Sequence, residues 1–135
     1  MKLSKAIILF FTSSFATNVF ACSCGPLDLS RMESGSPVIF SGVLAKKSNV
    51  RSTSMVSYTF TPSKMYKGEF QKSVEVITEK YSAACGQQFK PKKEYVILAY
   101  EEEGKLHTDI CSSWEREGYQ SSQTQKLEEY MSRKQ

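Results

Sequence analysis

Four cysteines are the residues of this sequence whose type and spacing most strongly suggest chemistry. Cys22 and Cys24 are separated by one residue, whereas Cys85 and Cys111 lie far downstream. Because a ring closed between Cys22 and Cys24 would be strained, we expect each of them to form a disulfide with one of the two distant cysteines. The residues alone leave open which partner each one takes. Either pairing ties this segment to the body of the domain, where chain ends otherwise fray.

The residues before the first cysteine have the features of a secretory signal peptide. Two lysines precede a short apolar core that begins AIILFF, and Val19 and Ala21 are small residues at the positions that a signal peptidase requires. The apolar stretch is too short for a good membrane span. We therefore expect residues 1–21 to be a cleaved signal peptide and residues 22–135 to be a single domain exported to the extracellular space or the periplasm.

Cleavage after residue 21 would leave a free α-amine on Cys22. This nitrogen and the carbonyl oxygen of the same residue can close a five-membered chelate ring around a metal ion, and catalytic zinc sites keep one position open for water or substrate. Free α-amines titrate at about 7.7–8.0, so a metal displaces the proton near neutral pH at small cost. A disulfide at Cys22 would also hold the adjacent backbone in place before binding. Less conformational entropy would then be lost when a complex forms. On spacing alone, however, Cys-x-Cys is more typical of a plain disulfide scaffold.

Catalytic chemistry has little support in this sequence. His107 is the only histidine, no His-Glu-x-x-His motif is present, and we interpret it as a solvent-facing or internally satisfied strand residue. The even number of cysteines leaves no free thiolate nucleophile. The run Glu101-Glu102-Glu103 indicates a solvated turn, and the sequence lacks a Gly-x-Ser-x-Gly elbow or phosphate loop. We predict a protein that is not an enzyme and has no cofactor of its own.

The charge pattern gives no sign of a nucleic-acid-binding surface. The formal net charge is +4, and the Lys and Arg residues are interleaved with Glu instead of forming a basic patch. No apolar run after the predicted signal peptide is long enough for a membrane span.

Five strands and a terminal helix are predicted to position the cysteines. The strands are Val38–Ala45, Met55–Tyr66, Ser73–Thr78, Tyr95–Tyr100 and Leu106–Ile110. Gly42 indicates a bulge or bend in the first strand, and Pro62 indicates an edge or a break in the second. Residues 46–54 are predicted to form a polar hairpin loop, and residues 27–34 a helical turn or two. Apolar spacing predicts an amphipathic helix over Thr124–Arg133.

This set of elements predicts an all-β fold with a terminal helix. The expected architecture is a five-stranded Greek-key barrel of the oligonucleotide/oligosaccharide-binding (OB) type. A seven-stranded sandwich is the alternative, but the sequence does not contain seven candidate strands.

Six segments of the chain match a known family in order and spacing. They are Cys22-Ser-Cys-Gly-Pro26, Val38-Ile-Phe-Ser-Gly-Val43, Lys64-Met-Tyr-Lys-Gly68, Tyr81-Ser-Ala-Ala-Cys-Gly86, Lys93-Glu-Tyr-Val-Ile-Leu98 and Gly104-Lys-Leu-His-Thr-Asp-Ile-Cys111. Together they resemble the netrin-like inhibitory domain of the tissue inhibitors of metalloproteinases, and residues 121–127 resemble the last helix of that domain. The resemblance covers nearly the whole predicted mature chain.

The resemblance implies a pairing and a mechanism that the spacing does not. It implies the disulfides Cys22–Cys85 and Cys24–Cys111 in a netrin-like barrel. It further implies that Cys22 offers its amine and carbonyl oxygen to the zinc of a target protease. The expected partner is a secreted or cell-surface zinc metalloprotease. The zinc would belong to that protease, and this chain would carry no cofactor of its own.

The resemblance also implies which residues would contact the protease. Ser23 would point its side chain into the main specificity pocket. The others would continue along the substrate groove or flank it, and they are Cys24, Gly25, Pro26, Ser82, Ala83 and Ala84.

The sequence departs from the family pattern in two ways. The family domain carries a third disulfide, for which this chain has no cysteine near Ser34 or at its C-terminal end. We therefore expect a less constrained terminal helix. The disulfide-rich second subdomain of the animal inhibitors is also absent from this sequence, so target preference does not carry over. Gly25 is expected to add flexibility to the inhibitory segment.

Two alternatives remain open at this stage. Residues 19–22 partly resemble a bacterial lipoprotein cleavage site, which would acylate the amine of Cys22, although Phe20 fits that pattern poorly. The domain could instead be a non-inhibitory netrin-like binding module, secreted or lipid-anchored. Blocking the amine of Cys22 distinguishes an inhibitor from a non-inhibitory binding module, because only inhibition through the zinc requires a free amine.

Overall fold

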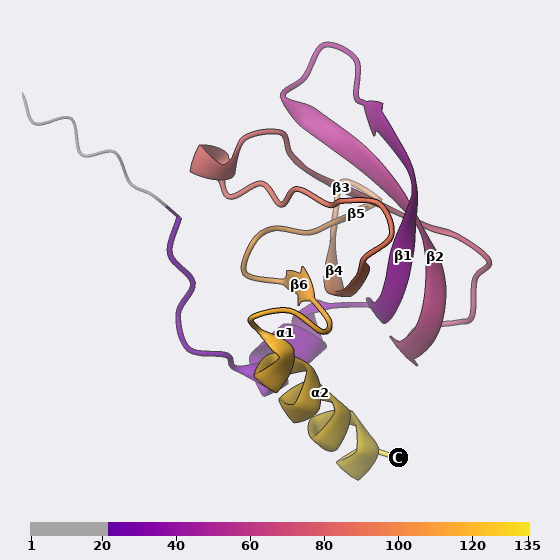
Figure 1. The fold of residues 1–135 in the computed structure, drawn as a ribbon, viewed down its shortest axis with the longest axis vertical. Coiled ribbons are helices and arrows are strands. Elements are labelled where there is room, and N and C mark those ends of the chain that lie inside the picture. The colour runs from indigo at the N-terminus through magenta and orange to yellow at the C-terminus, as the bar shows by residue number, and fades with distance from the viewer. Residues whose placement is uncertain (1–21) are drawn as a thin grey trace, which may run out of the picture.

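The computed structural model describes residues 22–135, and the predicted signal peptide lies outside them. Two helices, a 3-10 turn and six strands make up this part of the chain (Figure 1). In order they are α1 (Leu29–Gly35), β1 (Val38–Asn49), β2 (Met55–Lys67), β3 (Val74–Glu79), the 3-10 helix η1 (Ser82–Ala84), β4 (Glu94–Glu102), β5 (Lys105–His107), β6 (Ser113–Glu115) and α2 (Ser121–Arg133). None of the helices in residues 22–135 has the length and apolar character to cross a bilayer.

Five of the strands form a closed ring. Its order is β1-β2-β3-β5-β4 and back to β1. Every pair in the ring is antiparallel except β3 and β5, which run parallel and meet at one residue pair, Ile77 with His107. The short β6 adds to β4 beside β5. The OB-type topology predicted from the sequence is confirmed as a five-stranded ring, although β6 was not expected and the ring is not a regular barrel.

Strands β1 and β2 form a long hairpin that extends beyond the ring (Figure 1). Strand pairing continues to Asn49, so the hairpin loop predicted over residues 46–54 is shorter than expected. Gly42 marks the expected bulge, because the register shifts there and a Cβ would lie 2.7 Å from the carbonyl oxygen of Thr61. Pro62 does not break β2. It faces Gly42 beyond the last pair with β3, where β2 is an edge strand as Pro requires.

Aromatic and β-branched side chains fill the interior of the ring. Alternate residues of β2 point inward, as the period of a strand requires. Phe89 enters from the loop before β4 and makes edge-to-face contacts with Tyr58, Phe60 and Tyr95, with ring centroids 4.8–5.0 Å apart. The buried members of this core are Phe40, Val56, Tyr58, Phe60, Val74, Val76, Phe89, Tyr95, Ile97 and Ala99.

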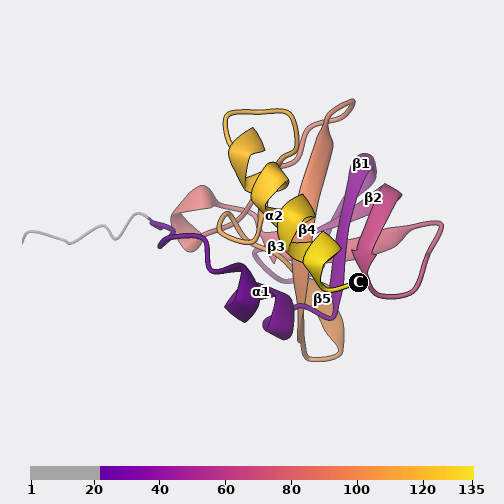
Figure 2. The ribbon, with the colours of Figure 1, turned by 90° about the horizontal axis from the view of Figure 1, so that it is seen from below.

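A second core lies between the outside of the ring and the two helices (Figure 2). Strand β4 contributes to both cores, which explains why its sequence is an unbroken apolar run. Trp114 of β6 is also buried here, and its indole N–H donates to Thr124 of α2 at 3.0 Å. The buried members are Ile39, Val96, Leu98, Trp114, Leu127 and Met131.

Ion pairs attach α2 to the rest of the domain. Nζ of Lys134, the residue after α2, lies 2.6 Å from a carboxylate oxygen of Glu33, which also pairs with Lys67 at 3.2 Å. These ion pairs connect the end of α2 to α1 and β2. In both views the C-terminus lies well away from the indigo segment with which the described chain begins (Figures 1 and 2).

Candidate functional site

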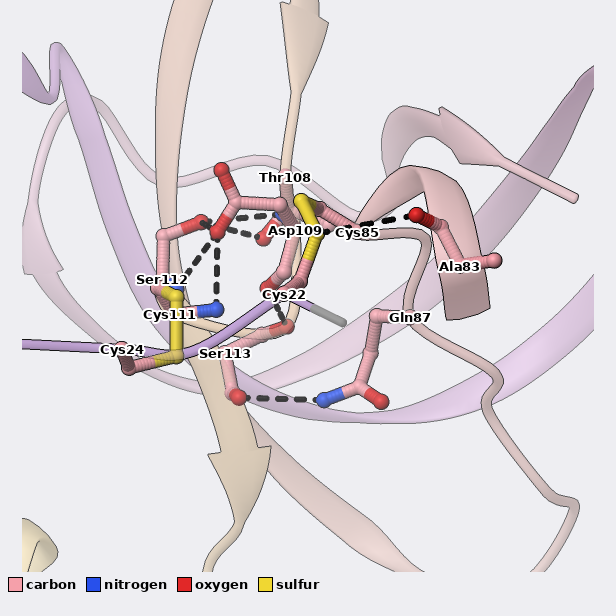
Figure 3. Close-up of a disulfide and its surroundings, with 10 residues drawn as sticks. All are labelled: Cys22, Cys24, Ala83, Cys85, Gln87, Thr108, Asp109, Cys111, Ser112 and Ser113. Carbon is pink, nitrogen blue, oxygen red and sulfur yellow. Dashed lines mark hydrogen bonds between the residues drawn. A yellow bond between two sulfur atoms is a disulfide. The ribbon is translucent and has the colours of Figure 1, made fainter. Parts of the chain in front are cut away.

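Two disulfides attach the first described residues to the ring (Figure 3). Cys22 pairs with Cys85 and Cys24 with Cys111, with Cα–Cα distances of 5.4 and 5.3 Å. This is the pairing that the family resemblance implies. The bonds span 63 and 87 residues of sequence, and closing such long loops removes conformational freedom from the unfolded chain, an effect of about 4 kcal/mol for each bond.

A tight turn fixes Cys85. This residue ends η1 in the left-handed conformation, with φ 65°. The carbonyl oxygen of Tyr81 accepts hydrogen bonds from the N–H groups of Ala84 and Gly86 at 3.0 and 3.1 Å. Gly86 is required because a Cβ there would overlap the carbonyl oxygen of Glu79. Backbone hydrogen bonds and close packing therefore determine where Cys85 places its sulfur.

The loop between β5 and β6 fixes Cys111. A carboxylate oxygen of Asp109, Oδ1, accepts the backbone N–H of Cys111 at 2.8 Å and that of Ser112 at 2.9 Å (Figure 3). Burial, together with the negative charge of Asp109, raises the pKa of the neighbouring Tyr100 to about 12, so its phenol stays protonated at neutral pH. This loop is ordered by its own side chains.

Two further hydrogen bonds join the segments that carry Cys85 and Cys111. The N–H of Ile110 donates to the carbonyl oxygen of Cys85 at 3.1 Å. The side-chain amide of Gln87 donates to the carbonyl oxygen of Ser113 at 3.1 Å. The two attachment points of the N-terminal segment are thus fixed relative to each other.

The structure gathers the residues expected at an inhibitory site into one exposed strip, which we define as Cys22–Pro26 together with η1. Residues 23–26 and 82–84 are all exposed. The sulfur of Cys22 lies 3.9 Å from the carbonyl oxygen of Ala83. Because a disulfide sulfur has no proton to donate, this is a packing contact. Two segments 61 residues apart in sequence therefore lie side by side, and their contact with a protease stays a prediction.

Sequence analysis did not identify Asp109 or Gln87 as part of this site. Asp109 was missed because the sequence predicted a strand over Leu106–Ile110, whereas β5 ends at His107 and Asp109 lies in the loop that follows. An Asp that binds the N–H two residues further on is a recognisable turn signal. Gln87 could not have been found, because its partner Ser113 is 26 residues away and no local pattern connects them.

A cavity of about 690 Å³ lies beneath part of the strip. Gly25 and Pro26 line one side, α1 contributes Met32, and the floor includes Tyr100 and Asp109. A Cβ placed on Gly25 would meet no atom within 4 Å. A side chain at this position would therefore meet open space.

Metal-binding and catalytic side chains do not gather at the strip. Within residues 22–135, no group of three or more His, Cys, Asp or Glu side chains is placed to hold a metal ion. His107 stacks on Tyr100 with ring centroids 6.0 Å apart, and its Nδ1 lies 3.8 Å from the carboxylate of Glu102. It is a half-buried strand residue that stacks on Tyr100. What the strip presents is exposed backbone held in place by disulfides.

A five-stranded OB-type ring whose N-terminal segment is bonded to two of its loops defines a netrin-like domain. The chain belongs to the tissue inhibitor of metalloproteinase family, whose sequence model matches residues 20–133. The family description is of inhibitors of metalloproteinases, not of enzymes. A comparison with curated proteins gave no match.

Proposed function

We propose that this protein is a secreted metalloendopeptidase inhibitor whose processed N-terminus blocks the catalytic zinc of its target. The amine and carbonyl oxygen of Cys22 bind the metal, and Ser23 enters the main specificity pocket. The remaining residues of the strip line the substrate groove. The observation that carries this proposal is the placement of Cys22 and Cys24, which two disulfides hold beside η1 while the intervening backbone stays exposed.

Preorganisation is the physical argument for this site. A flexible chain end loses several kcal/mol of conformational freedom when it is ordered in a complex, and rigid attachment before binding reduces that loss. Here the disulfides act on residues 22 and 24, and the hydrogen bonds of Cys85 and Cys111 fix the other end of each bond. A rigid bidentate ligand can then replace the water of a catalytic zinc.

The proposal requires that the mature chain begin at Cys22 with an unmodified amine. It therefore includes export, removal of residues 1–21 and no lipid on Cys22. The family match over residues 20–133 supports treating 22–135 as one domain.

The test compares three forms of the purified, oxidised protein against a panel of secreted zinc metalloendopeptidases. They are the chain that begins at Cys22, the same chain with one alanine before Cys22, and the chain acetylated at its amine. We expect the first form alone to inhibit stoichiometrically, and the other two to lose about a hundredfold or more in affinity. Circular dichroism and the melting temperature should be the same for all three.

Removing the added alanine with an aminopeptidase is the matched control, and it should restore inhibition. An extended form that inhibits as well as the native one would refute zinc chelation by the amine. Retention of partner binding by all three forms without inhibition would instead favour a netrin-like binding module. The intact mass of the exported protein reports the cleavage point, any acyl group and the number of disulfides.

A further inference from the structure

The exposed strip is held in position by its two disulfides and by Leu27, the residue after it, which packs against the second core. The described part of the chain offers no hydrogen bond to residues 23–27. Gly25 and Pro26 line the cavity of about 690 Å³. The Cys24–Cys111 bond fixes the position of Cys24 at the start of this half of the strip, so the placement of Cys111 matters for it.

Asp109 determines the conformation around Cys111. Its Oδ1 accepts three hydrogen bonds, from the N–H of Cys111 at 2.8 Å, the N–H of Ser112 at 2.9 Å and the hydroxyl of Ser112 at 3.1 Å. The backbone of Asp109 takes part as well, since its N–H donates to Oγ of Ser112 at 3.0 Å and its carbonyl oxygen accepts from the hydroxyl of Ser113 at 2.8 Å. Figure 3 shows these bonds converging beside the disulfide.

The chemistry of the acceptor makes this loop rigid. Hydrogen bonds to a carboxylate are shorter and about twice as strong as those between neutral groups. One oxygen that binds two consecutive N–H groups fixes the peptide planes on both sides of Cys111, and with them the direction of its Cα–Cβ bond. Removing the carboxylate would leave both N–H groups without this partner.

We propose that Asp109 is a positioning residue for the inhibitory strip. It orders the loop that carries Cys111 and, through the Cys24–Cys111 bond, sets where Cys24 and the residues beside it lie. It acts through the disulfide and has no contact with the protease zinc. This role rests on the proposed function, which makes the position of the strip matter, but the ordering of the strip can be measured without any protease.

The experiment uses Asp109→Ala, Asp109→Asn and a matched control. The asparagine variant keeps the accepting oxygen and loses only its charge. The control is Thr53→Ala, which removes a side-chain acceptor from the N–H of Met55 in the β1–β2 turn, far from Cys111 in sequence and fold. The first measurement is the rate at which dithiothreitol reduces each disulfide, followed by alkylation and mass spectrometry well below the melting temperature. The second is the inhibition constant.

We expect Asp109→Ala to speed reduction of Cys24–Cys111 about tenfold relative to Cys22–Cys85, and to weaken inhibition about ten- to hundredfold. Asp109→Asn should stay within a few-fold of the native protein in both measurements, and Thr53→Ala should match it. Equal acceleration of both bonds, or unchanged inhibition by Asp109→Ala, would overturn the positioning role. If the native protein inhibits no protease but the selective reduction is observed, the proposed function fails and the ordering role of Asp109 stands.

Discussion

At the scale of single residues, Gly25 limits how rigid the strip can be. It lies next to Cys24, and no side chain at this position restricts the backbone. Its φ is outside the left-handed region, and a Cβ would meet no atom within 4 Å. An alanine therefore fits the observed conformation and would remove unfavourable freedom from the uncomplexed chain, an effect worth about 0.4–1 kcal/mol.

We expect Gly25→Ala to tighten inhibition by about two- to fivefold, measured as the inhibition constant against a responsive protease. Gly35→Ala is the matched control, because a Cβ there also meets no atom within 4 Å but Gly35 lies in α1 outside the strip. Weaker inhibition by Gly25→Ala would mean that the complex needs a backbone conformation or a close approach that only glycine permits.

The residues of the strip illustrate what the sequence could and could not predict. Chemical reasoning singled out Cys22 because its amine and carbonyl oxygen can close a chelate ring around a metal ion while a disulfide holds the adjacent backbone. Strain excluded a bond between Cys22 and Cys24, but nothing local distinguished Cys85 from Cys111 as partner, since that depends on which loops the ring brings to the same edge. The family resemblance supplied the pairing.

At the scale of elements, the contact between β6 and α2 depends on one buried hydroxyl. Oγ1 of Thr124 accepts from the indole N–H of Trp114 and donates to the carbonyl oxygen of Arg116, both at 3.0 Å. Trp114 is 1% exposed, so its N–H has no access to water in the folded protein.

We predict that Thr124→Val lowers the free energy of unfolding in urea by about 1–3 kcal/mol, because it leaves this indole N–H unpaired while keeping a similar volume. Thr124→Ser keeps the hydroxyl, so its free energy of unfolding should fall by less than half as much as that of Thr124→Val. A valine variant as stable as the native protein would show that the hydrogen bond contributes nothing to the docking of α2.

Strand prediction succeeded where the pattern was strong and local. Alternation in β2 and the apolar run in β4 gave those strands within a few residues. β6 was missed because three residues carry no period, and its pairing with β4 is a tertiary interaction. The last four residues of β1 were missed because they, such as Lys46 and Ser48, have exposed polar side chains that resemble a loop.

At the scale of the whole molecule, carboxylates connect the helices to the ring. Hydrogen bonds from Lys134 and Lys67 hold the pKa of Glu33 below its usual 4.5. Burial raises the pKa of Glu94, but hydrogen bonds from Ser63 and Arg116 outweigh it, so the pKa of Glu94 is also lowered.

Glu128 of α2 follows the same pattern. Burial raises its pKa, but hydrogen bonds from Lys64 and Tyr66 outweigh that effect and leave the pKa below 4.5. Arg116 lies between the two carboxylates, 3.1 Å from Glu94 and 3.5 Å from Glu128. Each of these acids is therefore more easily ionised in the folded than in the unfolded chain.

A lowered pKa stabilises the folded state above the unfolded value, and this stabilisation is lost as the pH falls through the folded value. We predict that the urea midpoint is nearly constant from pH 7 to about pH 5 and falls steeply below about pH 4.5. The triple variant Glu33→Gln, Glu94→Gln and Glu128→Gln should be less stable at pH 7 and show a flatter profile below pH 4.5. Glu69→Gln, at an exposed residue outside these ion pairs, is the control and should keep the native profile. An unchanged slope in the triple variant would contradict this account.

The separation of the two chain ends has a practical consequence. The strip includes the first described residues, at the indigo end of the ribbon, whereas α2 carries the C-terminus away from them (Figure 1). A tether, surface linkage or fused carrier joined after Gln135 would therefore project away from the strip. The domain can be immobilised by one end while the other remains open to solvent.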